Sequence, residues 1–384
     1  MTRLAVLGAT GSIGRQTLEV AARERDRLQV VALSAGRDLD GLVAAARLWR
    51  PGALALEDAA DPAAARHALT GACPGAEVWT GRDSSARMIA ATRCDVVLNG
   101  IVGSAGLAAS LAALAQGARL ALANKETLVV GAPLVKAALA RGGALVPVDS
   151  EHSAALQCLS GRPPAEVACL TLTASGGPLR GHADWRHATP AEVLAHPVWA
   201  MGRRITTDSA LLVNKALELI EARALFDLEW HQLGAVLHPE ARIHAIVTFT
   251  DGGTVLEAAP ADMRLPIQLA LSWPAHWGPA IVPLEPTALA GLTLETIPTG
   301  RFPAFDLGVA AGRRGGTAPC VFNAADEIAV ARFLDGTIPL GAVPEVLEHV
   351  LGEHDVQPVV SFEQLREVDA WARAAATRRV ATRV

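Results

Sequence analysis

The chain has 384 residues, a formal net charge of −5, and a composition that is 51 % hydrophobic and 19 % charged. These values exclude a disordered chain and argue against a general nucleic-acid-binding protein, and the length allows two or three domains. No run of about 18 uninterrupted apolar residues is present, so we expect no membrane span. The first strand begins at about Arg3, so we also expect no targeting peptide. We therefore predict a cytoplasmic α/β protein.

Alternating apolar strands and helices in residues 1–149 predict a Rossmann-like, doubly wound parallel sheet. Strands are expected at 3–7, 28–34, 95–99, 119–123 and 144–148, with a helix at 12–25 after the first. Another helix carries Leu107, Leu111 and Leu114 on one face, at spacings of four and three residues. Fold class is therefore α/β for this part.

The rest of the chain predicts an α+β domain at 150–284, a proline-marked linker at 285–304 and a C-terminal helical domain at 305–384. Strands are expected at 167–173 and 243–249, and one helix at 209–225. Residues 175–203 show little periodicity, which is typical of a mobile or functional segment, and we interpret them as a lid. In the last domain, the clearest helices are expected at 323–334 and 344–352.

The glycines Gly8, Gly11 and Gly14 lie between the first strand and the first helix. Such a turn brings backbone N–H groups close to a pyrophosphate, although a plain strand–helix turn is the alternative. NAD-binding proteins usually end the second strand with an acid that holds the ribose 2′-hydroxyl. Here the strand ends in Gly36 and Arg37, and a guanidinium suits a 2′-phosphate. The sequence therefore favours NADPH.

Residue usage excludes two other kinds of oxidoreductase. The chain has no tyrosine, so it cannot be a short-chain dehydrogenase, which needs a catalytic tyrosine. None of its five cysteines lies in a polar, glycine-rich context, which argues against a cysteine-dependent aldehyde dehydrogenase. No C-x-x-C pair is present, so a cysteine zinc site or a disulfide framework is not expected. Only three lysines occur, at 125, 136 and 215, against 31 arginines, which draws attention to each of them.

Asp149 and Glu151 follow a predicted strand end, where open α/β sheets bind ligands. Two carboxylates so close together repel unless a cation lies between them, and oxygen ligands suit Mg²⁺ or Mn²⁺. Glu218 offers a third carboxylate and shares a helix face with Asn214 and Lys215. The alternative is an ordinary Lys–Glu pair on a helix surface.

Further polar groups indicate an anion site and a proton donor. Lys125 follows a strand end, where its ammonium could reach a carbonyl oxygen of a ligand, although a solvated turn lysine is the alternative. Ser175, Ser209 and Lys215 are the types of group that bind phosphate. His196 and Trp199, in the irregular segment, are consistent with a lid that brings a polar and an apolar side chain over a ligand.

With these residues identified, the chain resembles the 1-deoxy-D-xylulose 5-phosphate reductoisomerase family over its whole length. The matching segments are GATGSIG (8–14), ANKETLV (123–129), PVDSEHSA (147–154), TASGGP (173–178), MRLPI (263–267) and a 27-residue block at 196–222. The resemblance implies an NADPH domain, a catalytic domain with a lid, a C-terminal helical domain and a homodimer.

The resemblance also implies roles for individual residues. The NADPH contacts would be Thr10, Gly11, Ser12, Ile13, Gly36, Arg37, Asp38, Asn124, Glu126 and Gly202. The metal (Mg²⁺ or Mn²⁺, with Co²⁺ as a further candidate) would be held by Asp149, Glu151 and Glu218, which with Lys125 form the catalytic set. The substrate contacts would be Lys125, Ser150, Glu151, Ser175, His196, Trp199, Ser209, Asn214, Lys215 and Glu218.

The implied reaction isomerises 1-deoxy-D-xylulose 5-phosphate and reduces the product to 2-C-methyl-D-erythritol 4-phosphate, a step of non-mevalonate isoprenoid precursor synthesis. The chain departs from the family pattern at Asp38, at Glu240 and Ala241, and at Asp326. Two other interpretations stay open at this point. One is another NADPH-dependent oxidoreductase, similar to homoserine dehydrogenase, and the other is an NADPH sensor without enzymatic activity.

Overall fold

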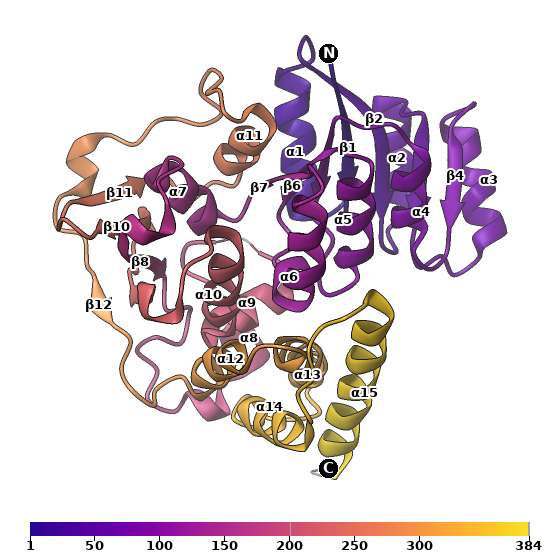
Figure 1. Ribbon diagram of the computed structural model, residues 1–384. Helices are drawn as coiled ribbons and strands as arrows, with labels where there is room; N and C mark the ends of the chain where they lie inside the picture. Colours follow the sequence, from indigo (N-terminus) through magenta and orange to yellow (C-terminus); the bar gives the residue numbers. More distant parts are fainter. Residues whose placement is uncertain (200, 383–384) are drawn as a thin grey trace. The chain divides into compact units, whose positions relative to one another are not determined.

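The computed structural model describes residues 1–199 and 201–382, and its contacts divide the chain into two compact units (Figure 1). The first unit comprises Met1–Thr127, Leu134–Ser153 and Asp262–Val282. The second comprises Leu128–Pro133, Ala154–Ala261 and the residues from Pro283 onward. Asp262–Val282 therefore groups with the N-terminal sheet, although the sequence placed it in 150–284. The division into four parts stays a prediction.

The first unit is built on a seven-stranded sheet in which every strand pair is parallel. The order is β4-β3-β2-β1-β5-β6-β7, so the first strand is central and the chain order reverses on either side of it. Ligands bind at such a reversal, outside the carboxyl ends of the strands. The strands are β1 (Thr2–Leu7), β2 (Leu28–Ala35), β3 (Ala53–Leu56), β4 (Glu77–Thr80), β5 (Val96–Asn99), β6 (Arg119–Leu122) and β7 (Ala144–Pro147).

Helices connect these strands and bury their apolar faces on the sheet. The helix predicted from the leucine spacing is confirmed, with Leu107 and Leu114 both buried. The helices are α1 (Ser12–Arg23), α2 (Leu39–Trp49), α3 (Pro62–Ala72), α4 (Ser84–Ala91), α5 (Gly106–Ala115), α6 (Glu126–Leu139) and α11 (Arg264–Ser272). Residues Leu128–Pro133 of α6 belong to the second unit, as do the residues of α7 (Ser150–Leu159) from Ala154 onward. The contacts of α11 with α1 attach this late segment to the first unit.

The second unit contains a mixed five-stranded sheet with the order β11-β10-β8-β9-β12. Only β8 and β9 are parallel in the described part, and the other pairs are antiparallel. Its core joins Leu170, Leu172 and Val247 of the sheet to Leu219 of a helix. The strands are β8 (Val167–Ala174), β9 (Leu233–Leu237), β10 (Ile243–Phe249), β11 (Thr254–Ala258) and β12 (Glu295–Thr296).

The C-terminal part of this unit is helical, as predicted. α13 lies at its centre, packs against both α14 and α15, and is buried along most of its length. The helices of the whole second unit are α8 (Pro190–Leu194), α9 (Arg203–Ala210), α10 (Val213–Phe226), α12 (Pro303–Arg314), α13 (Ala318–Leu334), α14 (Ala342–Glu353) and α15 (Phe362–Ala381). Its 3₁₀ turns lie at Pro164–Glu166, Trp185–His187, Trp230–Gln232 and Pro286–Leu289. Within the described residues, no helix combines the length and the apolar character needed to cross a bilayer.

One prediction of local structure was wrong. The single helix expected at 209–225 is two helices, α9 and α10, because Leu212 adopts a left-handed conformation with φ of 55°. The described residues of 175–203 have little regular structure, as expected, apart from one 3₁₀ turn and one short helix. The short helix is α8, whose start is stabilised by a capping box in which Thr189 and Glu192 bind each other's backbone N–H groups.

Candidate active site

The glycine-rich turn after β1 requires glycine at two positions. Gly8 has φ of 73°, and a Cβ atom there would lie 2.7 Å from the carbonyl oxygen of Gly100. A Cβ atom at Gly14 would lie 2.2 Å from the carbonyl oxygen of Gly8. The turn is therefore packed against the end of β5 and against the first turn of α1. Larger side chains would force these backbones apart.

This turn presents the start of α1 as an anion-binding end. Gly11 is the N-cap and provides no side chain to the free N–H groups that follow. The N–H of Ala9 donates to the carbonyl oxygen of Ser34 at 2.7 Å, which holds the turn beside the end of β2. Thr10, Gly11, Ser12 and Ile13 lie in this turn and first helical turn. The local geometry thus fits a pyrophosphate.

At the end of β2, the two charged residues predicted to contact NADPH have different surroundings. The side chain of Arg37 is 85 % exposed and forms an ion pair with Asp58. Asp38 is the N-cap of α2, and its carboxylate accepts a hydrogen bond from the N–H of Gly41 at 2.9 Å. The acid at 38 is therefore engaged in starting a helix, which explains how it is tolerated at this position.

Asn124 and Glu126 have buried side chains that shape the loop after β5. The amide nitrogen of Asn124 donates to the carbonyl oxygens of Ile101 and Gly103, at 2.8 and 2.9 Å, and to Glu126. Glu126 in turn accepts from the N–H of Gly103 at 3.1 Å. These bonds fix the edge of the sheet where a cofactor would lie. A direct contact of the two side chains with NADPH stays a prediction.

Lys125 and Asp149 lie together at the carboxyl ends of β6 and β7. The Lys125 ammonium is 2.9 Å from one Asp149 oxygen, and the other oxygen is 3.4 Å from the imidazole of His152. Ser150 donates its hydroxyl to Glu151. Ligand oxygens of Asp149 and Glu151 lie within 4.8 Å of each other, as a shared cation requires.

The sequence reasoning did not find His152. It is completely buried and lies one helical turn after Asp149, with its Nδ1 at 3.4 Å from that carboxylate. The spacing of three residues at the start of α7 was the available signal.

In the second unit, α10 brings Asn214, Lys215 and Glu218 together on one face, as predicted. The Asn214 amide donates to one oxygen of Glu218, and the Lys215 ammonium pairs with the other. The Lys215 and Glu218 side chains are only 3 % and 1 % exposed, so the alternative of a helix-surface pair is wrong. Burying an ion pair costs desolvation free energy that a surface pair does not pay. Buried charged groups of this kind are candidates for a functional site.

His196 connects Ser175 and Ser209. Its Nδ1 accepts hydrogen bonds from the N–H groups of Val198 and Trp199, at 3.2 and 2.9 Å, which places the proton on Nε2. That Nε2 lies 3.1 Å from the Ser175 hydroxyl and 3.2 Å from the Ser209 hydroxyl. Burial lowers the pKa of the imidazole, so His196 is a neutral donor at neutral pH.

The backbone explains why these three side chains meet. Gly177 has φ of 66°, and a Cβ atom there would lie 2.7 Å from the carbonyl oxygen of Ser209. The turn after β8 can therefore approach the end of α9 only with glycine at 177. Trp199 is half-buried, with its ring 6.2 Å from that of His244, and Gly202 is the N-cap of α9. Ala200, inside the predicted lid, lies outside the described residues.

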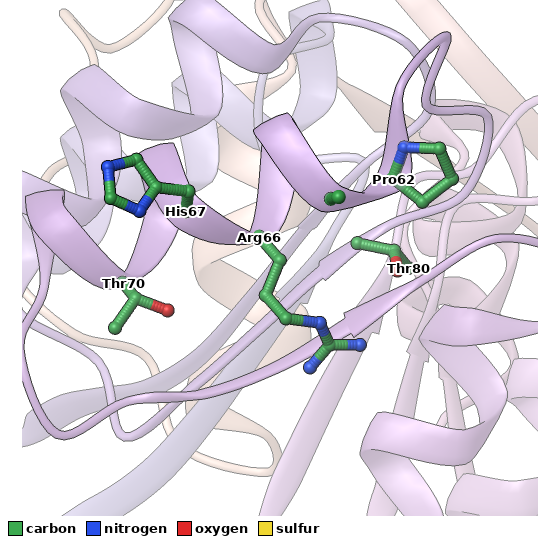
Figure 2. A pocket seen from close by; sticks show the side chains of 6 residues that line it. Pro62, Arg66, His67, Thr70 and Thr80 are labelled. Carbon is green, nitrogen blue, oxygen red and sulfur yellow. The ribbon is translucent and has the colours of Figure 1, made fainter.

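A surface hollow elsewhere in the first unit contains none of the predicted site residues. It has a volume of about 520 Å³ and is lined by residues of α3 and the end of β4 (Figure 2). Arg66, which lines it, donates a hydrogen bond to the carbonyl oxygen of Val78 at 2.6 Å and so joins the helix to the edge strand.

Comparison with known proteins decides the family. A family model described as 1-deoxy-D-xylulose 5-phosphate reductoisomerase matches residues 4–132, and two models of C-terminal domains of that enzyme match 145–226 and 258–375. A 1-deoxy-D-xylulose 5-phosphate reductoisomerase of Pseudarthrobacter chlorophenolicus is 47 % identical, over 99 % of this chain and 98 % of the relative. The chain belongs to the 1-deoxy-D-xylulose 5-phosphate reductoisomerase family.

Other reductoisomerases show how far this likeness extends. The one from Moorella thermoacetica is 44 % identical over 96 % of both chains. A crystal structure of DOX-P reductoisomerase with NADPH, fosmidomycin and magnesium superposes with a TM-score of 0.94 at 32 % identity, covering 99 % of this chain and 98 % of that one. The Zymomonas mobilis reductoisomerase in complex with NADPH has a TM-score of 0.89 at 36 % identity, with 99 % of both chains covered. The family resemblance and the α/β fold class are thereby confirmed.

Proposed function

We propose that this protein converts 1-deoxy-D-xylulose 5-phosphate to 2-C-methyl-D-erythritol 4-phosphate, with NADPH and a divalent cation. The observation that carries the proposal is its membership of the reductoisomerase family over 99 % of its length. The proposed residues also support it, because those within each unit have the hydrogen bonds and burial that their roles require.

The first unit holds NADPH in this proposal. Thr10, Gly11, Ser12 and Ile13, at the start of α1, would hold the pyrophosphate, and Gly36, Arg37 and Asp38 would border the 2′-phosphate. Asn124 and Glu126 would shape the loop beside the nicotinamide, and Gly202, the N-cap of α9, is a further proposed NADPH contact. NADPH supplies the hydride of the reduction.

Asp149, Glu151 and Glu218 are the proposed ligands of Mg²⁺ or Mn²⁺, with Co²⁺ as a further candidate. The donor set fits a hard cation because it consists of carboxylate oxygens. Asp149 lies beside Lys125 and His152, Glu151 accepts from the Ser150 hydroxyl, and Glu218 is bound by Asn214 and Lys215. When bound, such an ion acts as a Lewis acid toward adjacent carbonyl and hydroxyl oxygens.

The remaining residues bind and protect the sugar phosphate. Neutral His196 donates from Nε2, and the hydroxyls of Ser175 and Ser209 lie on the same side, so all three can donate to phosphate oxygens. Asn214 and Lys215 extend this anion site. Trp199 would cover the ligand and exclude water from the branched aldehyde phosphate that the isomerisation forms. Lys125 exchanges a proton with the oxygens that change protonation during the isomerisation.

The test is NADPH consumption with 1-deoxy-D-xylulose 5-phosphate, measured with Mn²⁺ and again with excess chelator. We expect consumption that the chelator abolishes. Consumption that ignores the chelator would leave the reductase and contradict the metal site. NADPH binding without consumption would return the two open interpretations, the other oxidoreductase and the sensor.

We also propose a cytoplasmic homodimer that binds neither nucleic acid nor membranes. The net charge of −5 supports the absence of nucleic acid. The outer strand β11 exposes Val255 and Leu256, at 41 % and 45 %, and an apolar strand edge of this kind suits pairing with a second copy. Light scattering on the eluting protein would give the mass of a dimer, and a monomer mass would contradict the proposal.

A further inference from the structure

The ends of β2 and β3 continue side by side beyond the sheet, which brings an acid to Arg37. The N–H of Glu57 donates to the carbonyl oxygen of Ala35 at 3.1 Å, and the N–H of Asp58 donates to that of Gly36 at 2.9 Å. Asp58 is thereby fixed opposite the residues proposed to hold the 2′-phosphate. Its carboxylate forms an ion pair with the Nε of Arg37, and both side chains are exposed, at 58 % and 85 %.

Two other carboxylates in this region have different tasks. Asp38 accepts a hydrogen bond from the N–H of Gly41 and caps α2. Glu57 accepts from the Ser84 hydroxyl and from the N–H of Ser85, at 3.1 and 3.4 Å, and so holds the start of α4. Asp58 is thus the member of this trio that meets the guanidinium.

We propose that Asp58 shifts the cofactor preference from NADPH toward NADH by competing with the 2′-phosphate of NADPH for Arg37. The inference rests on the proposed function, since it assumes that Arg37 borders the 2′-position. A 2′-phosphate that binds this guanidinium either displaces the carboxylate from Nε or shares the cation with it, and in both cases it lies close to a like charge. NADH has a hydroxyl at the 2′-position, which does not compete with the carboxylate for Arg37. This hydroxyl can donate a hydrogen bond to the carboxylate. Asp58 therefore weakens NADPH binding selectively.

The effect is modest because both charges are exposed to water. Exposed ion pairs are weak and are screened by salt. Removing the Asp58 charge should therefore tighten NADPH binding by about 1.5-fold to fivefold at low ionic strength, and by less at high ionic strength. NADH binding should stay unchanged or weaken.

The experiment compares dissociation constants of NADPH and NADH for the wild type, Asp58→Asn, Arg37→Met and the double variant, by fluorescence titration at low and high salt. Asp26→Asn is the matched control, since it removes the same charge from an exposed position. Asp26 precedes the amino end of β2, whereas Asp58 lies near the carboxyl end. We expect Asp58→Asn to raise the ratio of NADPH to NADH affinity. In the Arg37→Met background, the gain should shrink, because no guanidinium is left to compete for.

Three results would overturn the inference. NADPH affinity that is unchanged or lower in Asp58→Asn would show that the carboxylate does not compete. An equal gain for both cofactors, or the same gain in Asp26→Asn, would show a general charge effect. Failure of the proposed function is a separate outcome, because the wild type would then bind neither cofactor or would not consume NADPH with the sugar phosphate.

Discussion

Replacing Asp326 with asparagine should stabilise the protein at neutral pH. The carboxylate lies on α13 and is completely buried. One of its oxygens accepts from the Arg204 guanidinium at 3.1 Å, and the same guanidinium also donates to Glu327 and lies 3.4 Å from Asp208. One cation thus serves three carboxylates. Burial raises the pKa of Asp326 to about 6, against the opposing effect of Arg204.

The sign and the size follow from this pKa. The folded protein holds the Asp326 proton more tightly than the unfolded chain, whose pKa is near the ordinary value of 3.8. The free energy of unfolding therefore falls as the pH rises from about 4 to about 6, and it stays lower above that range. The difference of about two between the folded and unfolded pKa values corresponds to about 3 kcal/mol of unfolding free energy. Asparagine has the same shape, needs no ionisation and keeps an oxygen for Arg204, so we expect a gain of about 1–3 kcal/mol at pH 7.

Glu327 is the matched control, because its carboxylate is bound to the same guanidinium but responds in the opposite way. Burial alone would raise the pKa of Glu327, yet the charges of Arg204 and Arg373 hold it below the ordinary value. Its ionised form therefore contributes stability that is present at pH 7 and is lost as the pH falls through its folded pKa. Glu327→Gln should destabilise the protein at pH 7.

Urea unfolding at several pH values between 4 and 8, followed by tryptophan fluorescence, measures both effects. Asp326→Asn should unfold at higher urea than the wild type at pH 7, and the two curves should converge toward pH 4. A loss of stability in Asp326→Asn as large as that in Glu327→Gln would refute the reasoning, since the ion pair with Arg204 would then outweigh the burial of the charge.

Three further substitutions test the proposed active site. Glu218→Gln should lower turnover at least about 100-fold, because one metal ligand loses its charge. The NADPH dissociation constant should stay within about twofold of the wild-type value. Turnover within a few-fold of wild type would contradict the assignment of Glu218 as the third metal ligand. Lys125→Met should lower turnover similarly, yet Mn²⁺ binding, followed by electron paramagnetic resonance, should hold or tighten, because the ammonium beside Asp149 is gone; weaker Mn²⁺ binding would count against this. His196→Gln should lower kcat/KM about 10–100-fold, as expected for a lost hydrogen bond to a charged group, without changing NADPH affinity.

Most of the first unit could be predicted from periodicity and strand ends. The strands at β1, β2, β5, β6 and β7 lie within one or two residues of the expected positions. β3 and β4 were not anticipated, although they are no shorter than β5, β6 and β7. β3 consists of alanine and leucine, which favour helices over strands, and β4 is only partly buried.

The break between α9 and α10 shows where a sequence pattern ends. Leu211 and Leu212 continue the apolar periodicity, and neither glycine nor proline marks the turn. Leu212 nevertheless adopts a left-handed conformation, which costs a non-glycine residue about 1 kcal/mol and so depends on tertiary packing. The i, i+4 pairing of Asn214 with Glu218 survived this error, because it lies wholly within α10.

Contacts between residues far apart in the chain explain the remaining differences, and Arg37 is the clearest example. From the sequence, the absence of an acid at the end of β2 favoured NADPH, since that is where NAD-binding proteins place it. The structure brings an acid to the same guanidinium from the end of the neighbouring strand, 21 residues later. Strand order, which depends on all the crossover connections, decides which strand end lies beside β2. A prediction of cofactor preference from the end of β2 alone therefore includes the charge of Arg37 but not that of Asp58. Asp58→Asn measures how much the second charge contributes.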